Sequence, residues 1–279
     1  MRIKVLVENT ASAGFCGEHG LCLYVEYKGK YYLMDSGASG LFAENADKLA
    51  VDLGKVDKAF LSHAHYDHSG GYAEFFARNN HAKVYLQQSA KGRDFYKIAE
   101  PVHKYIGIPE GLLDQYSDRF QYVDGAATID DWIHIVPHSA PGILERAKRT
   151  HMCVIADGQT SLDDFSHEQT VVFEEEDGLV CFNSCSHAGV DLIVGEVSQA
   201  FPGRKIKAYI GGFHMMGIDG VLSCGYSKEE VQTVAKKLRK LPDIQFYSGH
   251  CTGQIAFDWL GEILHGRLTA LKTGMAFDV

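Results

Sequence analysis

The chain is organised around residues 61–71, which read LSHAHYDHSGG. Three histidines and an aspartate fall between His63 and His68, directly after the apolar run Ala59-Phe60-Leu61. The apolar run is typical of the end of a buried strand, and Gly70-Gly71 favours a tight turn into a helix, so a strand-to-helix loop is expected. Imidazole nitrogen and carboxylate oxygen are ligands that suit zinc, manganese or iron. Four such groups this close in sequence cannot all reach one ion without strain, so the stretch predicts two adjacent metal ions.

The alternative interpretation is a histidine-rich surface loop. Such a loop gives no reason for the apolar strand before it or for the double glycine after it. The pattern HxHxDH resembles the signature of the metallo-β-lactamase superfamily. The resemblance is closest to the branch of the ribofuranosylaminobenzene-phosphate dihydropterin synthase of methanopterin biosynthesis, most of whose members are called only metal-dependent hydrolases. Further motifs that carry it are Glu18-His19-Gly20, Asp35-Ser36-Gly37, Asn45-Ala46, Cys185-Ser186-His187-Ala188-Gly189, Gly211-Gly212-Phe213-His214 and Ser248-Gly249-His250-Cys251-Thr252-Gly253.

The composition is that of an ordinary globular chain. Its 279 residues are 46% hydrophobic and 23% charged, and no flexible linker, fixed-period repeat or low-complexity segment divides them. We therefore expect one domain over residues 1–279. The first residues are too short and too alternating for a signal peptide, and no apolar run approaches the ~18 residues of a membrane helix. A soluble, cytoplasmic protein without a membrane partner is expected, and its oligomeric state is left open.

The net charge and the cysteines argue against a nucleic-acid partner, a disulfide framework and a structural zinc site. The net charge is −9 and no basic stripe offers phosphate contacts, so no nucleic-acid partner is expected. The seven cysteines are odd in number and lack a paired CxxC spacing, which argues against a disulfide framework and a structural zinc site. Cys185 and Cys251 stand out because each flanks a histidine that we assign to the metal site.

The order of the predicted elements indicates an α/β protein with mixed sheets. The resemblance implies more: a four-layer αββα sandwich, with two mixed sheets face to face and helices outside. Residues 90–128 are irregular and rich in aromatic side chains, which predicts an insertion or lid over the metal site, with a local core as the alternative. The predicted strands are 2–7, a hairpin within 22–34, 58–62, 82–87, 132–137, 151–156, 169–174, 179–185, 206–210 and 244–247, and helices are expected at 41–53, after 71, around 192–197 and from 228. A hairpin turn is predicted at 175–178, and a capping box at Ser227 and Glu230 is predicted to open the last of these helices.

The resemblance also implies how the ligands divide between the two ions. One ion would be held by His63, His65 and a histidine from the second half of the chain, and the other by Asp67, His68 and His250. We assign His187 to the first ion, because it follows a strong predicted strand and precedes a helix.

Three features of the site stay open. His138, near Pro141-Gly142, is a rival to His187 as the third ligand. Cys185 and Ser186 stand where many members of the superfamily place an aspartate that bridges the ions, which suggests a bridge of water or hydroxide alone or an unusual ligand role for His214. Asp35, at the exit of a predicted strand, is expected either to orient a ligand imidazole or to form a turn.

The expected activity is hydrolysis of an ester, lactone or phosphoester in a small soluble metabolite. Two divalent ions, with zinc favoured and manganese or iron as alternatives, would supply a metal-bound hydroxide. Asp67 would bind metal and accept a proton, while His214 would donate a proton or hold a phosphate. The alternatives are a synthase-like condensation on a pterin stacked by the aromatic residues of 95–122, and a metal-dependent binding protein without catalysis.

Overall fold

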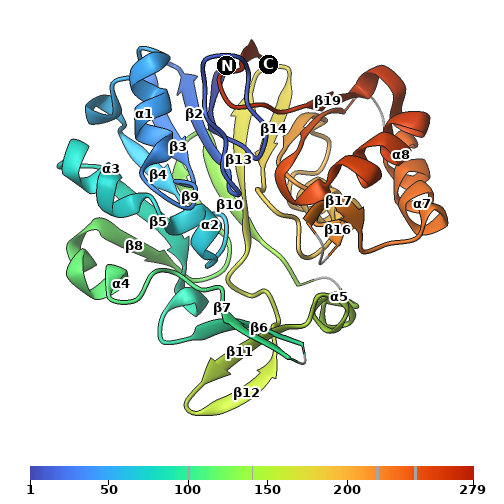
Figure 1. The fold of residues 1–279 in the computed structure, drawn as a ribbon. Coiled ribbons are helices and arrows are strands. Elements are labelled where there is room, and N and C mark those ends of the chain that lie inside the picture. The colour runs from blue at the N-terminus through green and yellow to red at the C-terminus, as the bar shows by residue number, and fades with distance from the viewer. Residues whose placement is uncertain (100, 140, 218–219, 242–243) are drawn as a thin grey trace.

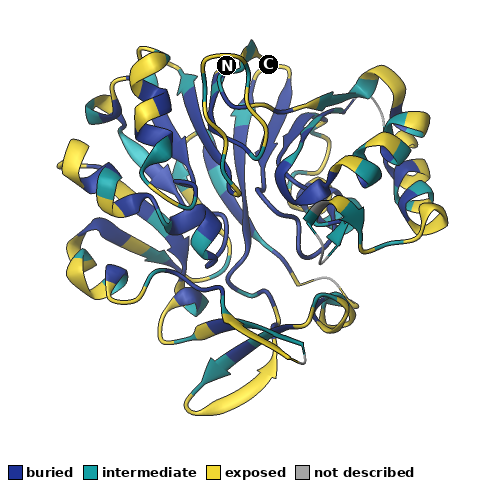
Figure 2. Ribbon diagram, in the orientation of Figure 1, coloured by how far each residue is buried: buried dark blue, intermediate teal, exposed yellow. Residues whose placement is uncertain are grey.

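Two seven-stranded sheets lie face to face, and helices cover the outer face of each sheet (Figure 1). Buried apolar residues form one cluster between the two sheets and another between each sheet and its helices. Figure 2 shows the same layering, with buried strands inside and exposed helix faces outside. The predicted four-layer αββα sandwich is confirmed. The computed structural model describes residues 1–99, 101–139, 141–217, 220–241 and 244–279.

The first sheet has the strand order β20-β1-β2-β3-β4-β5-β8. It is antiparallel from β20 to β3 and parallel from β3 to β8. The hairpin predicted within 22–34 is present, and its turn residues Lys28 and Gly29 have φ of 50° and 72°. The strands are β1 (Arg2–Val7), β2 (Cys22–Tyr27), β3 (Lys30–Met34), β4 (Lys58–Phe60), β5 (Lys83–Gln87), β8 (Phe120–Val123) and β20 (Ala276–Asp278).

The second sheet has the order β19-β18-β15-β14-β13-β10-β9. Its strands β14, β15, β18 and β19 are parallel, and the hairpin predicted at the turn 175–178 joins β13 to β14. The parallel strands of both sheets deliver their following loops to one edge of the sandwich, which is where sites collect in layered α/β proteins. The strands are β9 (Ala127–Asp130), β10 (Ile133–Pro137), β13 (Gln169–Glu175), β14 (Gly178–Phe182), β15 (Ile206–Ile210), β18 (Gln245–Ser248) and β19 (Leu268–Ala270).

The helices lie outside the two sheets, and their ends follow local chemistry. The capping box predicted at Ser227 and Glu230 is present and opens α7. The helix predicted over 41–53 ends at Lys48 instead, because the chain turns at Ala50 with φ of 52°. The helices are α1 (Leu41–Lys48), α2 (Tyr66–Ser69), α3 (Tyr72–Arg78), α4 (Leu112–Gln115), α5 (Ile143–Thr150), α6 (Val190–Ala200), α7 (Lys228–Arg239) and α8 (Gln254–Leu264).

A separate four-stranded sheet, of order β12-β11-β6-β7, crosses the lower end of the sandwich in Figure 1. Residues 90–128 thus contain more secondary structure than their sequence indicates. They include the helix α4, and they supply the strands β6, β7 and β8 and the start of β9 to three different sheets. Within the described part of the chain no helix has the length and apolar character to cross a membrane. The remaining strands are β6 (Asp94–Ala99), β7 (Val102–Tyr105), β11 (Met152–Ala156), β12 (Gln159–Leu162), β16 (Met216–Gly217) and β17 (Gly220–Cys224).

Candidate metal centre

The stretch 61–71 leaves β4, and the helix predicted after the double glycine is α3. The segment between them is not all loop as predicted, because the short helix α2 forms within it. His63 and His65 precede this helix, and Asp67 and His68 lie within it. The double glycine allows the backbone to pack directly on a neighbouring loop. A Cβ at Gly70 would lie 2.1 Å from the carbonyl oxygen of Ala38, so no other residue fits there without a shift of the backbone.

Three histidines form the first ligand set. The ring centroids of His63, His65 and His187 lie 4.6 to 4.9 Å from one another. Nε2 of His63, Nε2 of His65 and both ring nitrogens of His187 are buried and have no hydrogen-bond partner among the described residues. Because buried polar atoms are normally paired, converging unpaired imidazoles fit a site for a metal ion.

The electrostatics of this set also suit a metal. Burial lowers the pKa of His63 and His187 well below the ordinary value, and it lowers that of His65 to about 3. The neighbouring imidazoles add to these shifts. All three rings are therefore neutral at neutral pH, which leaves a nitrogen lone pair free for coordination.

The second ligand set consists of Asp67, His68 and His250. Nε2 of His68 and Nε2 of His250 lie 3.1 Å apart, and Oδ2 of Asp67 lies 3.6 Å and 3.4 Å from them. Burial opposes a charge on Asp67, but the neighbouring His68, His19 and His250 outweigh it and hold its pKa well below the usual range. Burial likewise opposes a charge on His68, yet Asp67 and Asp35 raise its pKa overall. This position favours a positive charge, which a proton or a metal ion can supply.

Hydrogen bonds outside the two sets fix which ring nitrogen faces the centre. Oδ2 of Asp35 accepts from Nδ1 of His68 at 2.8 Å and from Oγ of Ser62 at 2.7 Å. Of the two roles expected for Asp35, the structure therefore shows the contact that orients a ligand imidazole. Because the Ser62 hydroxyl is used in this way, Nδ1 of His63 donates to it at 2.8 Å. Nδ1 of His250 donates to Oδ1 of Asn9 at 2.9 Å. In all three rings the lone pair is thereby left on Nε2, which is the arrangement that metal-binding histidines use.

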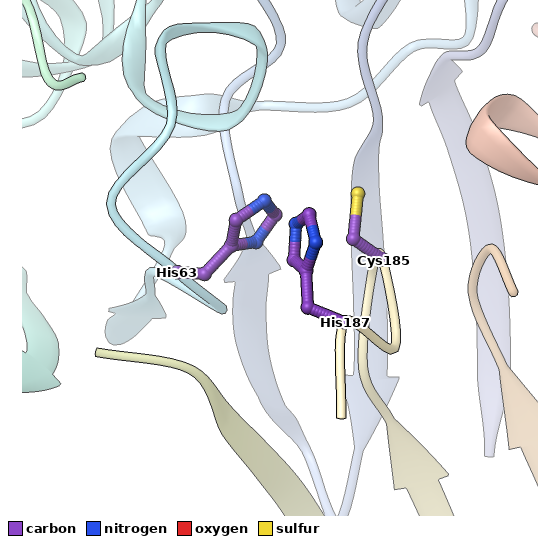
Figure 3. A group of neighbouring side chains, drawn as sticks. All are labelled: His63, Cys185 and His187. Atoms are coloured by element: carbon purple, nitrogen blue, oxygen red, sulfur yellow. The ribbon is translucent and has the colours of Figure 1, made fainter. Parts of the chain in front are cut away.

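Cys185 lies between the two sets. Its Sγ is 3.3 Å from Nε2 of His68. The ligand atoms of Cys185, His63 and His187 all lie within 4.8 Å of one another, and so do those of Cys185, His68 and His250. Figure 3 shows the thiol beside His63 and His187. The position that the sequence left open for a bridging group is therefore filled by a buried sulfur atom.

His214 lies at the centre as expected. Its ring centroid is 4.1 Å from that of His187, and its buried Nδ1 has no partner among the described residues. Phe213 is buried in the core of the second half, and Gly211 allows a close approach, since a Cβ there would lie 1.8 Å from the carbonyl oxygen of Asn183. Burial, followed by the charges of His65, His250 and Lys97, lowers the pKa of His214 to about 3.

The rival ligand His138 has other partners. Its Nδ1 contacts Oε2 of Glu196 at 2.8 Å, and its Nε2 contacts Oγ1 of Thr170 at 2.9 Å and Nδ2 of Asn183 at 3.1 Å. Both ring nitrogens are thus used within the protein. His138 stabilises the outer side of the second sheet and supplies no lone pair to the centre.

Several residues that lie near the metal centre have no role assigned from the sequence alone. Nε2 of His19 lies 3.2 Å from Oδ2 of Asp67; His19 belongs to a motif of the resemblance, which was the available signal. Asp163 and His167 stand beside His65, and Nε2 of His167 donates to Asp163 at 3.1 Å. Glu168 accepts from the backbone N–H of His187 at 2.7 Å. These three lie in an irregular loop whose sequence carries no periodic signal.

Four residues of the metal centre have a strained backbone conformation. Asp35, Ser186, His214 and His250 have φ between 47° and 58°, the left-handed region that residues other than glycine seldom adopt. Strained residues of this kind gather at active sites and ligand sites. The surrounding hydrogen bonds hold them, for example the bond from the Ser186 hydroxyl to the Gly212 carbonyl at 2.6 Å.

A cavity of about 370 Å³ opens onto the centre. His65, Asp67, Cys185, His187 and His214 line its floor. Its aromatic lining consists of Tyr66 and Tyr226, among the residues that the structure describes. The aromatic residues expected to stack a pterin, Phe95, Tyr96, Tyr105, Tyr116, Phe120 and Tyr122, do not line this cavity, and Phe95 and Phe120 belong to the core of the first half.

Comparisons with known proteins agree with this fold. The sequence profile of the metallo-β-lactamase superfamily matches residues 17–138. The uncharacterized protein MJ0448 of Methanocaldococcus jannaschii is 26% identical over 94% of this chain and 94% of its own. The 7,8-dihydropterin-6-methyl-4-(β-D-ribofuranosyl)-aminobenzene-5′-phosphate synthase of the same organism is 24% identical over 91% of this chain and 88% of its own. The crystal structure of Tm1679, a metal-dependent hydrolase of the β-lactamase superfamily, has a TM-score of 0.84 at 26% identity and covers 100% of this chain and 99% of its own.

Proposed function

We propose that this chain, which is similar to the metallo-β-lactamase superfamily, is a hydrolase with two metal ions, which acts on an ester, lactone or phosphoester of a small metabolite. His63, His65 and His187 would hold the first ion, and Asp67, His68 and His250 the second. The observation that carries the proposal is the convergence of two buried ligand sets on one sulfur atom, that of Cys185. Nitrogen, sulfur and carboxylate ligands together favour zinc, with manganese and iron as the alternatives.

Two divalent ions, when bound, lower the pKa of water and polarise the electrophile. The chain's own residues supply the remaining steps. Oδ2 of Asp67 is an acceptor beside both His19 and His250, so it is placed to take a proton. His214 stays neutral at neutral pH because its pKa is lowered to about 3. It therefore acts as a hydrogen-bond donor to charge that develops on the substrate, rather than as a charged acid.

The cavity limits the substrate to a small molecule, since about 370 Å³ lies at the lower end of the range for ligand pockets. The net charge of −9 supports the expectation that nucleic acid is not the substrate.

The test is to measure the metal content of the purified protein and, in parallel, its turnover of phosphoesters, lactones and simple esters. Two ions per chain with turnover of one of these classes supports the proposal. Metal without turnover on any of them would favour a binding protein instead.

A synthase-like condensation is the second candidate, and the observation that favours it is the alignment of 91% of this chain with the M. jannaschii synthase. The aromatic lining weighs against it, because only Tyr66 and Tyr226 of the described residues offer rings to a pterin in the cavity. Tight binding of a reduced pterin together with weak hydrolysis of simple esters would favour the synthase.

A further inference from the structure

The wall of the cavity away from the ligand sets carries two lysines on the separate four-stranded sheet. Lys97 on β6 lies directly opposite Lys104 on β7, and Met152 on β11 lies directly opposite Lys97. All three line the cavity whose floor includes His65 and His214. Side chains that are direct cross-strand partners point to the same face of a sheet. The row of three residues therefore presents two ammonium groups to the cavity.

No carboxylate among the described residues balances the charge of these lysines. Among residues 1–99, 101–139, 141–217, 220–241 and 244–279, no carboxylate oxygen lies within 4.0 Å of Nζ of Lys97 or Lys104. Nζ of Lys104 lies 3.4 Å from the hydroxyl of Tyr66 and 4.9 Å from the centre of that ring. Lys97 is half-buried, and burial together with Lys104 lowers its pKa. Like charges directly opposite in a sheet are destabilising, so this pair has a cost to folding unless an anion binds between them.

The third cation of the cavity differs from this pair. Nη2 of Arg149 lies 2.8 Å from Oε1 of Glu230, and its guanidinium stacks on Tyr226 at 4.5 Å from the ring centre. Its charge is already compensated on the protein. Among the described residues, the uncompensated positive charge of the cavity is thus that of Lys97 and Lys104, in a chain whose net charge is −9.

We propose that Lys97 and Lys104 form a binding site for a phosphate monoester group of the substrate, held at the wall of the cavity away from the bond that reacts. The inference rests on the proposed function and narrows its substrate class to small phosphorylated metabolites. A phosphate monoester carries about −1.5 to −2 charges at neutral pH, which matches two ammonium groups. Lysine is a compact cation that binds phosphate as a point charge. Met152, in the same row, adds an apolar surface beside the two ammonium groups.

The test measures the affinity of the metal-loaded protein for inorganic phosphate by calorimetry, in the wild type, Lys97→Met and Lys104→Met. Lys236→Met, an exposed position on α7, is the matched control. We expect phosphate affinity to fall about ten- to hundredfold in each cavity variant, the range for losing a hydrogen bond to a charged group, and to stay unchanged in the control. Phosphate that binds only through the metals would be bound equally by all four proteins, and this result would overturn the proposal.

A structural role of Lys97 is tested by one further variant and by the melting temperature of Lys97→Met. Lys97→Arg should retain part of the phosphate affinity. The melting temperature of Lys97→Met should not fall, because the variant removes a repulsion between like charges. A lower melting temperature without a change in phosphate affinity would make Lys97 a structural residue and would also overturn the proposal.

Malonate, a dicarboxylate, is the second probe of the two lysines. If malonate but not phosphate binds in a lysine-dependent way, the assignment to phosphate is wrong. Metal content and hydrolysis of phenyl acetate, an uncharged ester, are measured in the wild type and should be unchanged in the control Lys236→Met. If the proposed function is wrong, metal content and ester hydrolysis will show it. If only the phosphate site is wrong, the phosphate affinities will show it, so the two failures are distinguishable.

Discussion

Nδ1 of His68 donates a hydrogen bond of 2.8 Å to Oδ2 of Asp35, and both side chains are fully buried between the two halves of the sandwich. This contact fixes the tautomer of His68 and points its Nε2 lone pair at Asp67, His250 and Cys185. We predict that Asp35→Asn lowers the affinity for the second ion about 10–100-fold, the usual effect of removing a partner of a metal-binding histidine. Metal titration with a competing chelator measures this affinity.

The substitution leaves the backbone intact, because asparagine tolerates the positive φ of 58° at this position. Asp114→Asn, at an exposed position of α4, is the control and should change nothing. Wild-type affinity in Asp35→Asn would show that the contact does not orient a ligand.

His65→Ala and His68→Ala should each empty at least one metal position. Losing one imidazole leaves an open coordination shell that the neighbouring side chains are too constrained to close. Elemental analysis of the purified variants gives the stoichiometry, with the exposed His81→Ala as the control. Two full equivalents in both variants would remove these residues from the ligand sets.

Cys185→Ser should abolish the thiolate-to-metal charge-transfer absorption of the cobalt-substituted protein. The thiol of Cys185 is the sulfur that lies among the ligand atoms of both sets, so coordination would deprotonate it. Cys16→Ser, at an exposed position, should leave the absorption unchanged. A cobalt spectrum without this band in the wild type would mean that the sulfur is a neighbour of the ions and not a ligand.

His214→Ala should keep both metal ions and lower turnover about 100-fold or more, the range for removing a hydrogen-bond donor to charge that develops on the substrate. The exposed His103→Ala, on β7, provides the comparison. Turnover and metal content must be measured on the same preparations. A variant that loses metal would instead make His214 a ligand.

The metal-free protein should lose stability as pH falls below about 6.5. The pKa values of His65 and His214 are lowered to about 3 and that of His250 to about 4, in each case chiefly by burial. Between the lowered values and the ordinary value of about 6.5, the unfolded chain binds protons at these three sites, and also at His63 and His187, where the folded chain does not. Each such site lowers the free energy of unfolding by about 1.4 kcal/mol per pH unit.

Two groups shift in the opposite direction. The pKa of His68 is raised, so its stabilising contribution is lost as pH rises through its folded value; below about 6.5 this contribution is fully present and no longer changes with pH. Burial raises the pKa of Glu168, which opposes the loss near its own titration, one group against five. Denaturant unfolding of the metal-free protein at pH 7 and pH 5 measures the difference. Equal or greater stability at pH 5 would contradict the prediction.

The sequence predicted most of the main strands and the strand-to-helix loop at 61–71, because both depend on neighbours within a few residues. Alternation of apolar residues is a local pattern, and so are the HxHxDH spacing and the double glycine. The same local reasoning assigned His187 and His214 to the centre, since each follows a buried strand. It missed the short extent of α1 and the regular structure within 90–128.

The tertiary structure alone decided the partners of these residues. His138 and His187 both follow a strand of the second sheet, and only the packing shows that His138 is bound by Glu196 and Thr170 while His187 faces His63. The position of Cys185 between the ligand sets depends on the meeting of two halves that are more than a hundred residues apart. Lys97 and Lys104 reach the cavity because β6 pairs with β11, from residues 94–99 to 152–156. Contacts of this kind leave no periodic pattern in a single sequence, since they depend on how whole sheets pack and not on the spacing of neighbouring residues.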